Sequence, residues 1–479
     1  MKHLVRRLLV VGAVLALLGC GSAALAAEDS AISVQLDGEI LTFTDAVPQV
    51  KSQRTFLPLR AVFEAMGAEV SYEDSTVTAV RGDTSLTMTL NSTEAKVVTG
   101  GQESVITMDV APYVDPTTWR TYVPVRFAAQ ALGCAVGWDQ DDQTVILIDT
   151  EKLLDSAVEG KSFTYMEAYT GLSQKYSTGI WDVKMNFDGG MSILNMPIAL
   201  SGSASGTVAD STKTALNMNM TMDMSGLITA LQQMSGEDAD LSAEDQALLD
   251  VLSKEGIGMQ MRGDAAAGTM YMNMTGSFLE ASGMDTGAWY SMDLNALCEQ
   301  MGMDYADLMR FSTNLDYKSL VGSALSSVTL DDCTDYEVVK ALVDGLAQFF
   351  SDDAFIQDGD VYTSSFAAEE DGGKFVMAFS VTMKNNKAVG YAISLSANIP
   401  LDEEGTPLVI GVSSSLDEKS QAKASIVLDA GGFVGVDLDM TSSYTAGSKA
   451  PETTPPAGAA VVPFEQMMAD ALAGTTPEA

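Results

Sequence analysis

Residues 54–72 read RTFLPLRAVFEAMGAEVSY, and residues 120–138 read RTYVPVRFAAQALGCAVGW. The two stretches align at an offset of 66 without a gap, and after a two-residue insertion the copies continue at Thr76 and Thr144. A repeat of this kind indicates two copies of one supersecondary unit. The first third of the chain is therefore expected to fold as a small duplicated module.

Each copy has the pattern of a strand, a helix and a β-hairpin. In the first copy a short β-prone run precedes Pro58, which suits a first helical turn because no N–H is needed there. An apolar stripe at helical spacing follows, made of Leu59, Val62, Phe63 and Met66. Gly67 then stands where a left-handed residue ends a helix.

Arg60 and Glu64 are spaced for an i, i+4 ion pair. Before the first copy, residues 32–44 (ISVQLDGEILTFT) predict an opening hairpin.

This segment resembles the copper amine oxidase N-terminal domain, the stalk domain of those enzymes. The residues that carry the resemblance are Val34-Gln35-Leu36-Asp37-Gly38, Arg54-Thr55-x-x-Pro58-x-Arg60 with Gly67, and Arg120-Thr121-x-x-Pro124-x-Arg126 with Gly133 and Trp138. The resemblance implies a stalk or adhesion module over residues 30–150. It does not imply copper, because the oxidase needs three histidine ligands and a tyrosine in an Asn-Tyr-Asp/Glu setting, which this chain lacks.

Residues 1–26 have the pattern of a signal peptide. Three basic residues precede an apolar run over 8–18, and a stretch of small residues ends at Ala26, where cleavage is expected. A second interpretation stays open: Leu17-Leu18-Gly19-Cys20 resembles a lipobox, in which Cys20 would be lipidated. Both interpretations predict a protein outside the cell, either secreted or anchored to the outer face of the cell membrane.

The charge balance and the residue types exclude several kinds of chemistry. The formal net charge is −39, and removal of residues 1–26, with three basic and no acidic residues, changes it to −42. Such a chain repels nucleic acid and anionic lipid, so we expect no nucleic-acid partner and no membrane contact beyond an N-terminal lipid anchor. The signal peptide also contains His3, the only histidine, so a mature chain has no histidine base or ligand. We therefore expect no cofactor, no metal and no catalytic residues.

Three cysteines remain beyond Cys20, with no zinc-site spacing among them. Cys298 and Cys333 are candidates for a disulfide, and Cys134 is expected to pack as a small apolar residue.

From residue 160 to 446 the chain alternates apolar and polar residues over long stretches, most clearly at Leu216, Met218, Met220, Met222 and Met224. A period of two predicts strands with one apolar and one wet face. We expect a large curved antiparallel sheet of about ten strands packed on helices, with a flexible tail over residues 447–479. The fold class is therefore α+β, mainly antiparallel β.

The predicted sheet resembles the half-barrel lipoprotein-carrier fold of the LolA and LppX type. Besides the overall layout, Ala288-Trp289-Tyr290-Ser291-Met292 is similar to the Gly-x-Trp-x-Lys strand of that fold, with Ser or Met in place of Lys. The resemblance implies that an acyl chain or another apolar molecule lies against the concave face.

The chain contains 28 methionines, and three interpretations of them stay open. Met fills irregular cores, it lines adaptable apolar cavities, and its thioether can bind Cu(I). Alternation argues against a metal, because it places the sulfurs where a sheet must be dry. The candidate apolar-ligand residues are Met185, Met218, Met220, Met222, Met259, Met261, Met270, Met272 and Trp289.

Three classes of function remain. The first is a non-catalytic extracellular or cell-surface binding protein with a stalk domain, whose partner is another cell-envelope component. The second is a carrier or sensor of a lipid or other apolar small molecule. The third is a hydrolase that uses only carboxylates, although no local motif points to a carboxylate pair.

Overall fold

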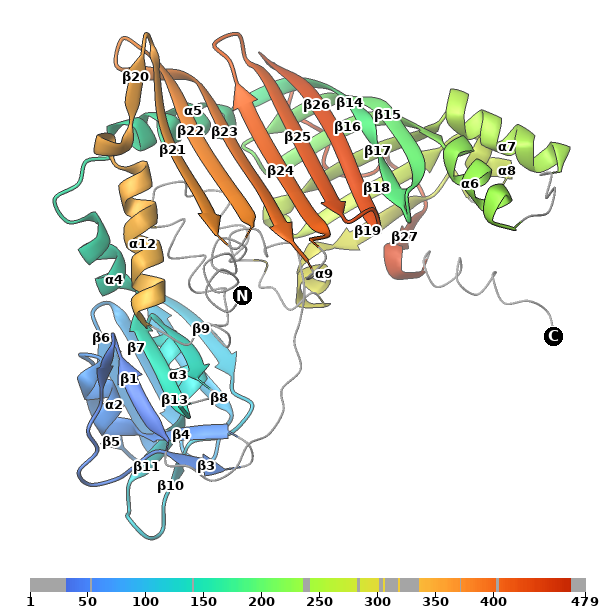
Figure 1. Cartoon of the computed structure of the whole chain (residues 1–479). Helices are drawn as coiled ribbons and strands as arrows, with labels where there is room; N and C mark the ends of the chain where they lie inside the picture. Colours follow the sequence, from blue (N-terminus) through green and yellow to red (C-terminus); the bar gives the residue numbers. More distant parts are fainter. Residues whose placement is uncertain are drawn as a thin grey trace. The chain divides into compact units, whose positions relative to one another are not determined.

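The computed structural model describes residues 32–51, 54–139, 142–235, 242–281, 285–300, 305, 318, 336–370, 372–401 and 405–466. The chain divides into two compact units: the first comprises residues up to 161 together with 317–348, and the second comprises the rest. Figure 1 shows the strands and helices of both units. The predicted class, α+β with mainly antiparallel sheets, is confirmed.

In the first unit, each copy of the repeat forms the expected strand, helix and hairpin. The elements of the first copy are β3 (Gln49–Lys51), β4 (Arg54–Pro58), α2 (Leu59–Ala65), β5 (Glu69–Glu73) and β6 (Thr76–Arg81). Those of the second are β10 (Tyr113–Val114), β11 (Thr121–Pro124), α3 (Val125–Ala131), β12 (Cys134–Asp139) and β13 (Thr144–Asp149). The remaining elements are β1 (Ser33–Leu36), β2 (Glu39–Ile40), β7 (Thr84–Thr89), β8 (Glu94–Thr99), β9 (Gln102–Thr107), α4 (Thr150–Val158) and most of α12 (Tyr336–Phe350).

The helix ends follow the local chemistry of the sequence. Pro58 caps α2 in an extended conformation, and the apolar stripe of the helix is buried as expected. Gly67 adopts a φ of 79°, and the amide of Ala68 donates to the carbonyl of Phe63 at 2.8 Å, which ends the helix with a left-handed residue. Gly133 ends α3 in the same way, with a φ of 81°.

The two copies are related by a local two-fold axis. The strand order β10-β11-β4-β3 places the equivalent strands β4 and β11 side by side and antiparallel. In their register Leu57 faces Val123, its own equivalent, and Phe56 faces Pro124. This is the pairing that an isologous contact requires, because each copy presents the same edge to the other. Both α2 and α3 pack on this strand pair, around one shared core.

The other strands of the first unit complete two further sheets. The order in one is β12-β13-β1-β2, and in the other β5-β6-β7-β8-β9. The predicted opening hairpin is β1 and β2, and β1 pairs in parallel with β13.

The second unit is organised around one sheet of fourteen strands rather than the ten expected. The strand order is β20-β21-β22-β23-β24-β25-β26-β14-β15-β16-β17-β18-β19-β27. Its first half contains β20 (Ile356–Asp358), β21 (Val361–Glu370), β22 (Gly373–Lys384), β23 (Lys387–Pro400), β24 (Pro407–Leu416), β25 (Gln421–Ala430) and β26 (Val434–Ala446). Its second half contains β14 (Ile180–Ile193), β15 (Met196–Ala209), β16 (Lys213–Asp223), β17 (Ile257–Asp264), β18 (Thr269–Thr275), β19 (Trp289–Asp293) and β27 (Val461–Pro463).

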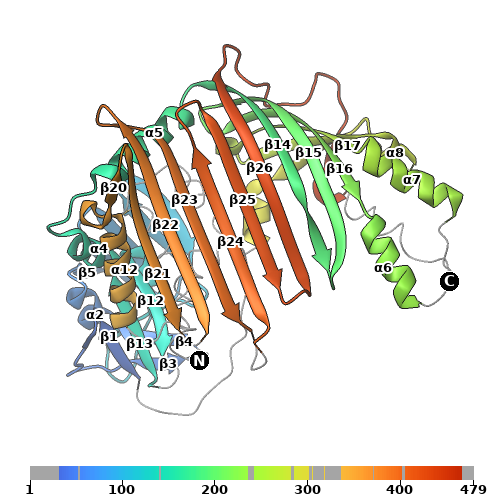
Figure 2. The same cartoon turned by 45° about the horizontal axis from the view of Figure 1, so that its top comes forward.

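The sheet is curved, as Figure 2 shows, and all its pairings are antiparallel except that of β19 with β27. Its centre is non-local: β14, the first strand of the unit in the sequence, pairs along its whole length with β26. Helices of this unit are α5 (Thr164–Ser177), α6 (Ser225–Ser235), α7 (Ala243–Lys254), α8 (Ser277–Ala281) and α9 (Leu294–Gln300). Among the helices described, none is both long and apolar enough to cross a membrane.

Part of the segment predicted as a tail is bound to the sheet. The short strand β27 adds to the edge of β19, and the Arg262 guanidinium donates to the Glu452 carboxylate and to the carbonyl of Thr454. Residues up to 466 are described, so the remainder of the predicted tail lies outside the described residues.

Candidate functional site

The register of the large sheet brings the predicted methionines together on one face. Residues paired across neighbouring antiparallel strands lie on the same face, and successive residues of one strand alternate between faces. Met218 pairs with Met259, and Met259 pairs with Met274. On the other side, Met218 pairs with Ala204, which pairs with Met185. We call the face that carries these residues the apolar face.

Three central rows of paired residues show the extent of the apolar face. The longest row contains Val381, Tyr391, Leu416, Ala422, Ser442, Met185, Ala204, Met218, Met259 and Met274. The next contains Phe379, Ile393, Ser414, Ala424, Met440, Phe187, Gly202, Met220 and Ile257. The third contains Met377, Leu395, Val412, Ile426, Leu438, Gly189, Leu200 and Met222. None of the three rows contains a charged residue.

The opposite face of the same strands is polar. The row between the first two contains Ser415, Lys423, Thr441, Asn186, Ser203, Asn219 and Gly258. The sheet therefore separates apolar from polar side chains over at least seven neighbouring strands, although β26 and β14 lie far apart in the sequence.

The structure places eight of the nine predicted ligand residues on the apolar face, and Trp289 on the other. Met261 pairs with Met272, and Met272 pairs with Tyr290 of β19. Because Tyr290 lies on the apolar face, its neighbour Trp289 points to the polar face. There the indole is 5% exposed, and the Arg262 guanidinium lies 5.2 Å from its ring centre. Tyr290, rather than Trp289, extends the apolar face.

Much of the apolar face is accessible to solvent. The side chains of all eight predicted methionines are half-buried. Ile393, Val412 and Ile426, on three neighbouring strands, are 39%, 38% and 39% exposed. These three residues were not among the predicted site residues. The sequence showed the alternation of apolar and polar residues in their strands. It did not show that these strands continue the sheet of the methionine strands, because that depends on the pairing of β14 with β26.

Helix α5 covers one end of the apolar face. The Tyr169 ring packs edge-on against Phe379 at 5.3 Å and against Tyr391 at 5.1 Å, measured between ring centres. Burial raises the pKa of the Tyr169 hydroxyl to about 12, so it stays neutral. Tyr176 packs on Trp181 and Tyr444 at the same end.

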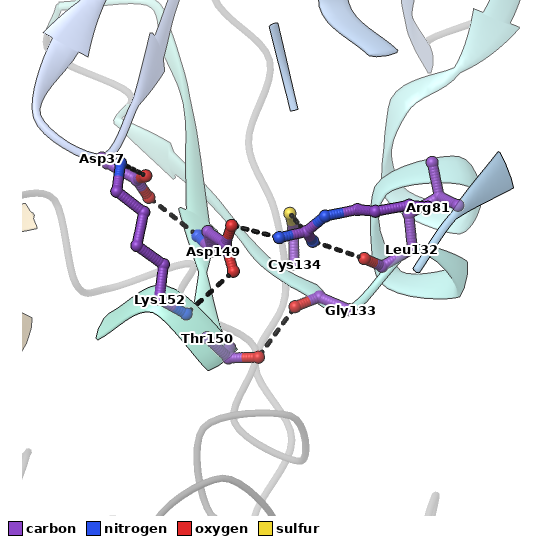
Figure 3. Close-up of polar contacts among 8 residues, drawn as sticks. All are labelled: Asp37, Arg81, Leu132, Gly133, Cys134, Asp149, Thr150 and Lys152. Atoms are coloured by element: carbon purple, nitrogen blue, oxygen red, sulfur yellow. Dashed lines mark hydrogen bonds and ion pairs between the residues drawn. The ribbon is translucent and has the colours of Figure 1, made fainter. Parts of the chain in front are cut away.

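A second cluster of polar side chains lies in the first unit, where the two copies of the repeat meet (Figure 3). Arg81 ends β6 and Asp149 ends β13, and the Arg81 guanidinium donates to the Asp149 carboxylate and to the carbonyl of Leu132. The Asp37 carboxylate accepts from the amide of Asp149 and from the Lys152 ammonium, each at 2.8 Å. A cavity of about 560 Å³ lies beside the cluster.

The charges of this cluster are already paired with one another. Arg81 and Asp149 satisfy each other, as do Lys152 and Asp37. Cys134 lies beside Arg81, and burial raises the pKa of its thiol to about 12, so it packs there as a neutral small residue, as expected. The cluster joins the two copies and leaves no unpaired charge among these five residues to attract a ligand.

This duplicated module has a known counterpart. Residues 35–147 match the family model of the copper amine oxidase N-terminal domain. The match lies within the predicted range of 30–150 and covers about a quarter of the chain. A search of the curated proteins finds no match, and neither does a search of the solved structures.

Among the arginines that carry the resemblance, Arg54, Arg60 and Arg120 make ion pairs. Arg54 pairs with Asp109 of the other copy, and Arg120 pairs with Asp45. Arg60 pairs with Glu64 at 3.5 Å, as its helical spacing predicts. Within the described part of the chain, no group of three or more His, Cys, Asp and Glu side chains is placed to bind a metal ion.

Two of the predicted modification sites lie outside the described residues. Cys20 belongs to the N-terminal segment, and Cys333 lies between 318 and 336. Cys298 is buried, and it forms no disulfide with another cysteine of the described residues. The Cys298–Cys333 disulfide and the lipidation of Cys20 therefore stay predictions.

Proposed function

We propose that this chain is an exported, non-catalytic binding protein that receives an acyl chain or a similar apolar ligand on the apolar face of its large sheet. The observation that supports this most is the register: it joins methionines of the second half of the sheet to exposed aliphatic residues of the first half in charge-free rows. A carrier of this kind needs an apolar surface that a ligand can reach and that does not cause the protein to aggregate. The stalk-like N-terminal module is compatible with a position at the cell surface.

The size of the apolar face suits a long acyl chain. Neighbouring strands lie about 4.8 Å apart, so a row across β22 to β26 extends about 19 Å. Each methylene of the ligand that is buried contributes about 0.8 kcal/mol to the free energy of binding. A long acyl chain buries many methylenes, and their sum is opposed by the entropy cost of ordering the chain. Methionine is suited to such a surface because its flexible thioether side chain adapts to changing neighbours. A sheet that needed only a rigid core would favour Val, Ile and Phe.

The test is titration of the mature chain with a fluorescent fatty-acid probe. Met218→Asp puts a charge in the centre of the longest apolar row, and Asn217→Asp puts the same charge one residue away on the polar face. We expect saturable binding by the wild type, an affinity at least about tenfold lower for Met218→Asp, and no change for Asn217→Asp. Circular dichroism checks that both variants fold.

Absence of saturable binding by the wild type would exclude the proposed ligand class. Equal binding by Met218→Asp would show that the methionines are core only. The proposed export has a separate test, the mass of the N-terminus of the protein purified from its host. A chain that begins after Ala26 and a chain that begins with a lipidated Cys20 have different masses.

A further inference from the structure

Trp119 is the most exposed large apolar side chain of the described residues, at 76%. It lies in the loop between β10 and β11, and its φ is 56°. A bulky residue rarely adopts a positive φ, because its Cβ crowds the backbone. A strained backbone that presents an apolar ring to water contributes nothing to a core, so it points to a role in binding.

The loop that carries Trp119 is held by one carboxylate. The amides of Thr117 and Thr118 donate to Oδ1 of Asp115, at 2.7 and 3.2 Å, and the side-chain amide of Gln49 donates to Oδ2 at 2.8 Å. These hydrogen bonds, that of Gln49 first, lower the pKa of Asp115, so the carboxylate is ionised. The backbone amide of Trp119 donates to the carbonyl of Asp115 at 2.8 Å. The exposed indole therefore stands on an ordered turn.

Comparison of the two copies shows that this loop is an addition to the repeat. In the first copy Val50 is followed four residues later by Arg54, whereas in the second Val114 is followed six residues later by Arg120. The strands on both sides of the loop match, since β3 and β4 correspond to β10 and β11. Trp119 stands where the first copy has Gln53. An insertion in one copy of a repeat adds a loop without disturbing the core, and such loops often form the binding face.

We propose that the Trp119 loop is a glycan-binding site, at which a pyranose ring of a β-1,4-linked chain stacks on the exposed indole. The axial C–H groups of such a sugar carry partial positive charge and meet the negative face of the aromatic ring. The Arg120–Asp45 ion pair begins at the next residue, and its side chains are 50% and 63% exposed. They provide donors and acceptors for sugar hydroxyls at the edge of the stacked ring.

The surroundings of Trp119 favour a glycan over a protein or a membrane. The core of a protein interface is depleted of charged residues, whereas a charged pair, Arg120 with Asp45, flanks Trp119. A membrane with anionic lipid would be repelled by a net charge of −39. The pyranose rings of β-1,4-linked glycans present flat C–H faces along an extended chain, so a flat aromatic platform on an ordered loop fits one of these rings.

Intrinsic fluorescence can follow this binding, because Trp119 is the exposed member of the four tryptophans. Trp138 and Trp181 are half-buried, and Trp289 is buried. The mature chain is titrated with three β-1,4-linked hexasaccharides, of N-acetylglucosamine, glucose and xylose. We expect at least one of them to give a saturable change in emission, and Trp119→Ala to weaken that binding at least about tenfold by calorimetry.

The matched control is Tyr72→Ala, which removes another exposed aromatic ring of the same module, one that lies on a strand rather than on the ordered loop. It is expected to leave glycan binding unchanged. The proposal is overturned if none of the three hexasaccharides binds, or if Trp119→Ala binds as the wild type does. It is also overturned if Tyr72→Ala reduces binding as much as Trp119→Ala. Because the Trp119 side chain is exposed, we expect its removal to leave the fold intact.

Discussion

Arg81 and Asp149 occupy equivalent positions in the two copies of the repeat, and they form an ion pair with each other. Equivalent residues meet only near the two-fold axis, where Leu57 also faces Val123. Two identical charged residues would repel each other at such a position. The contact at the axis is attractive only because the two copies differ at this position, with Arg in one and Asp in the other.

We expect Arg81→Met to destabilise the first unit by about 3 kcal/mol, because it leaves the Asp149 carboxylate without its cation in a site where the Asp149 side chain is 12% exposed. The measurement is the unfolding midpoint of the mature chain by calorimetry. Arg60→Met is the matched control, since the Arg60–Glu64 pair is 70% and 57% exposed and an exposed pair contributes little. Equal midpoints for the two variants would contradict the prediction.

The buried thiol of Cys134 is expected to make the folded chain less stable at alkaline pH. An unfolded thiol ionises at its ordinary pKa of 9.0, whereas burial raises the pKa of Cys134 in the folded chain to about 12. The unfolded chain therefore loses the proton first, and unfolding becomes more favourable as the pH rises from 9 towards 12, by up to about 1.4 kcal/mol per pH unit. Cys134→Ala is expected to show a shallower loss over this range than the wild type in urea unfolding. Parallel curves for the two proteins would show that the thiol is not responsible.

Two truncations of the C-terminal segment are expected to differ in stability and in self-association. A chain that ends at Ser448 loses Glu452, the partner of Arg262, and uncovers the backbone edge of β19. An uncovered edge strand pairs readily with other chains. We expect a lower unfolding temperature and self-association in size-exclusion chromatography. A chain that ends at Gln466 keeps β27, so it should behave as the full chain does. Identical behaviour of the two truncations would show that β27 protects nothing.

We expect no amine oxidase activity from the mature chain, with or without added Cu²⁺. The family match covers residues 35–147 only, and the oxidase chemistry needs histidine ligands that the chain beyond His3 does not contain. The measurement is hydrogen peroxide release from a panel of primary amines. Release that is lost after treatment with a chelator would refute this expectation.

The duplicated module was largely determined by local sequence. The start, the buried face and the end of α2 were all predictable from sequence, because each depends on residues only a few positions apart. They are set by Pro58, by the stripe from Leu59 to Met66, and by Gly67. The same holds for α5 and α7 and for the alternation of each long strand. Such features depend on neighbours at fixed spacing along the chain, and periodicity shows them directly.

Only the tertiary structure decided which strands are neighbours and therefore what the apolar face contains. Strand β19 has apolar residues at both parities, so its sequence could not show that Tyr290 joins the methionines while Trp289 faces away. The pairing of β14 with β26, which joins Met185 to the row of Leu416, connects segments about 250 residues apart. Alternation determines which residues share a face within one strand. The order of strands depends on the hydrogen bonding and burial of the whole sheet, and no local pattern specifies it.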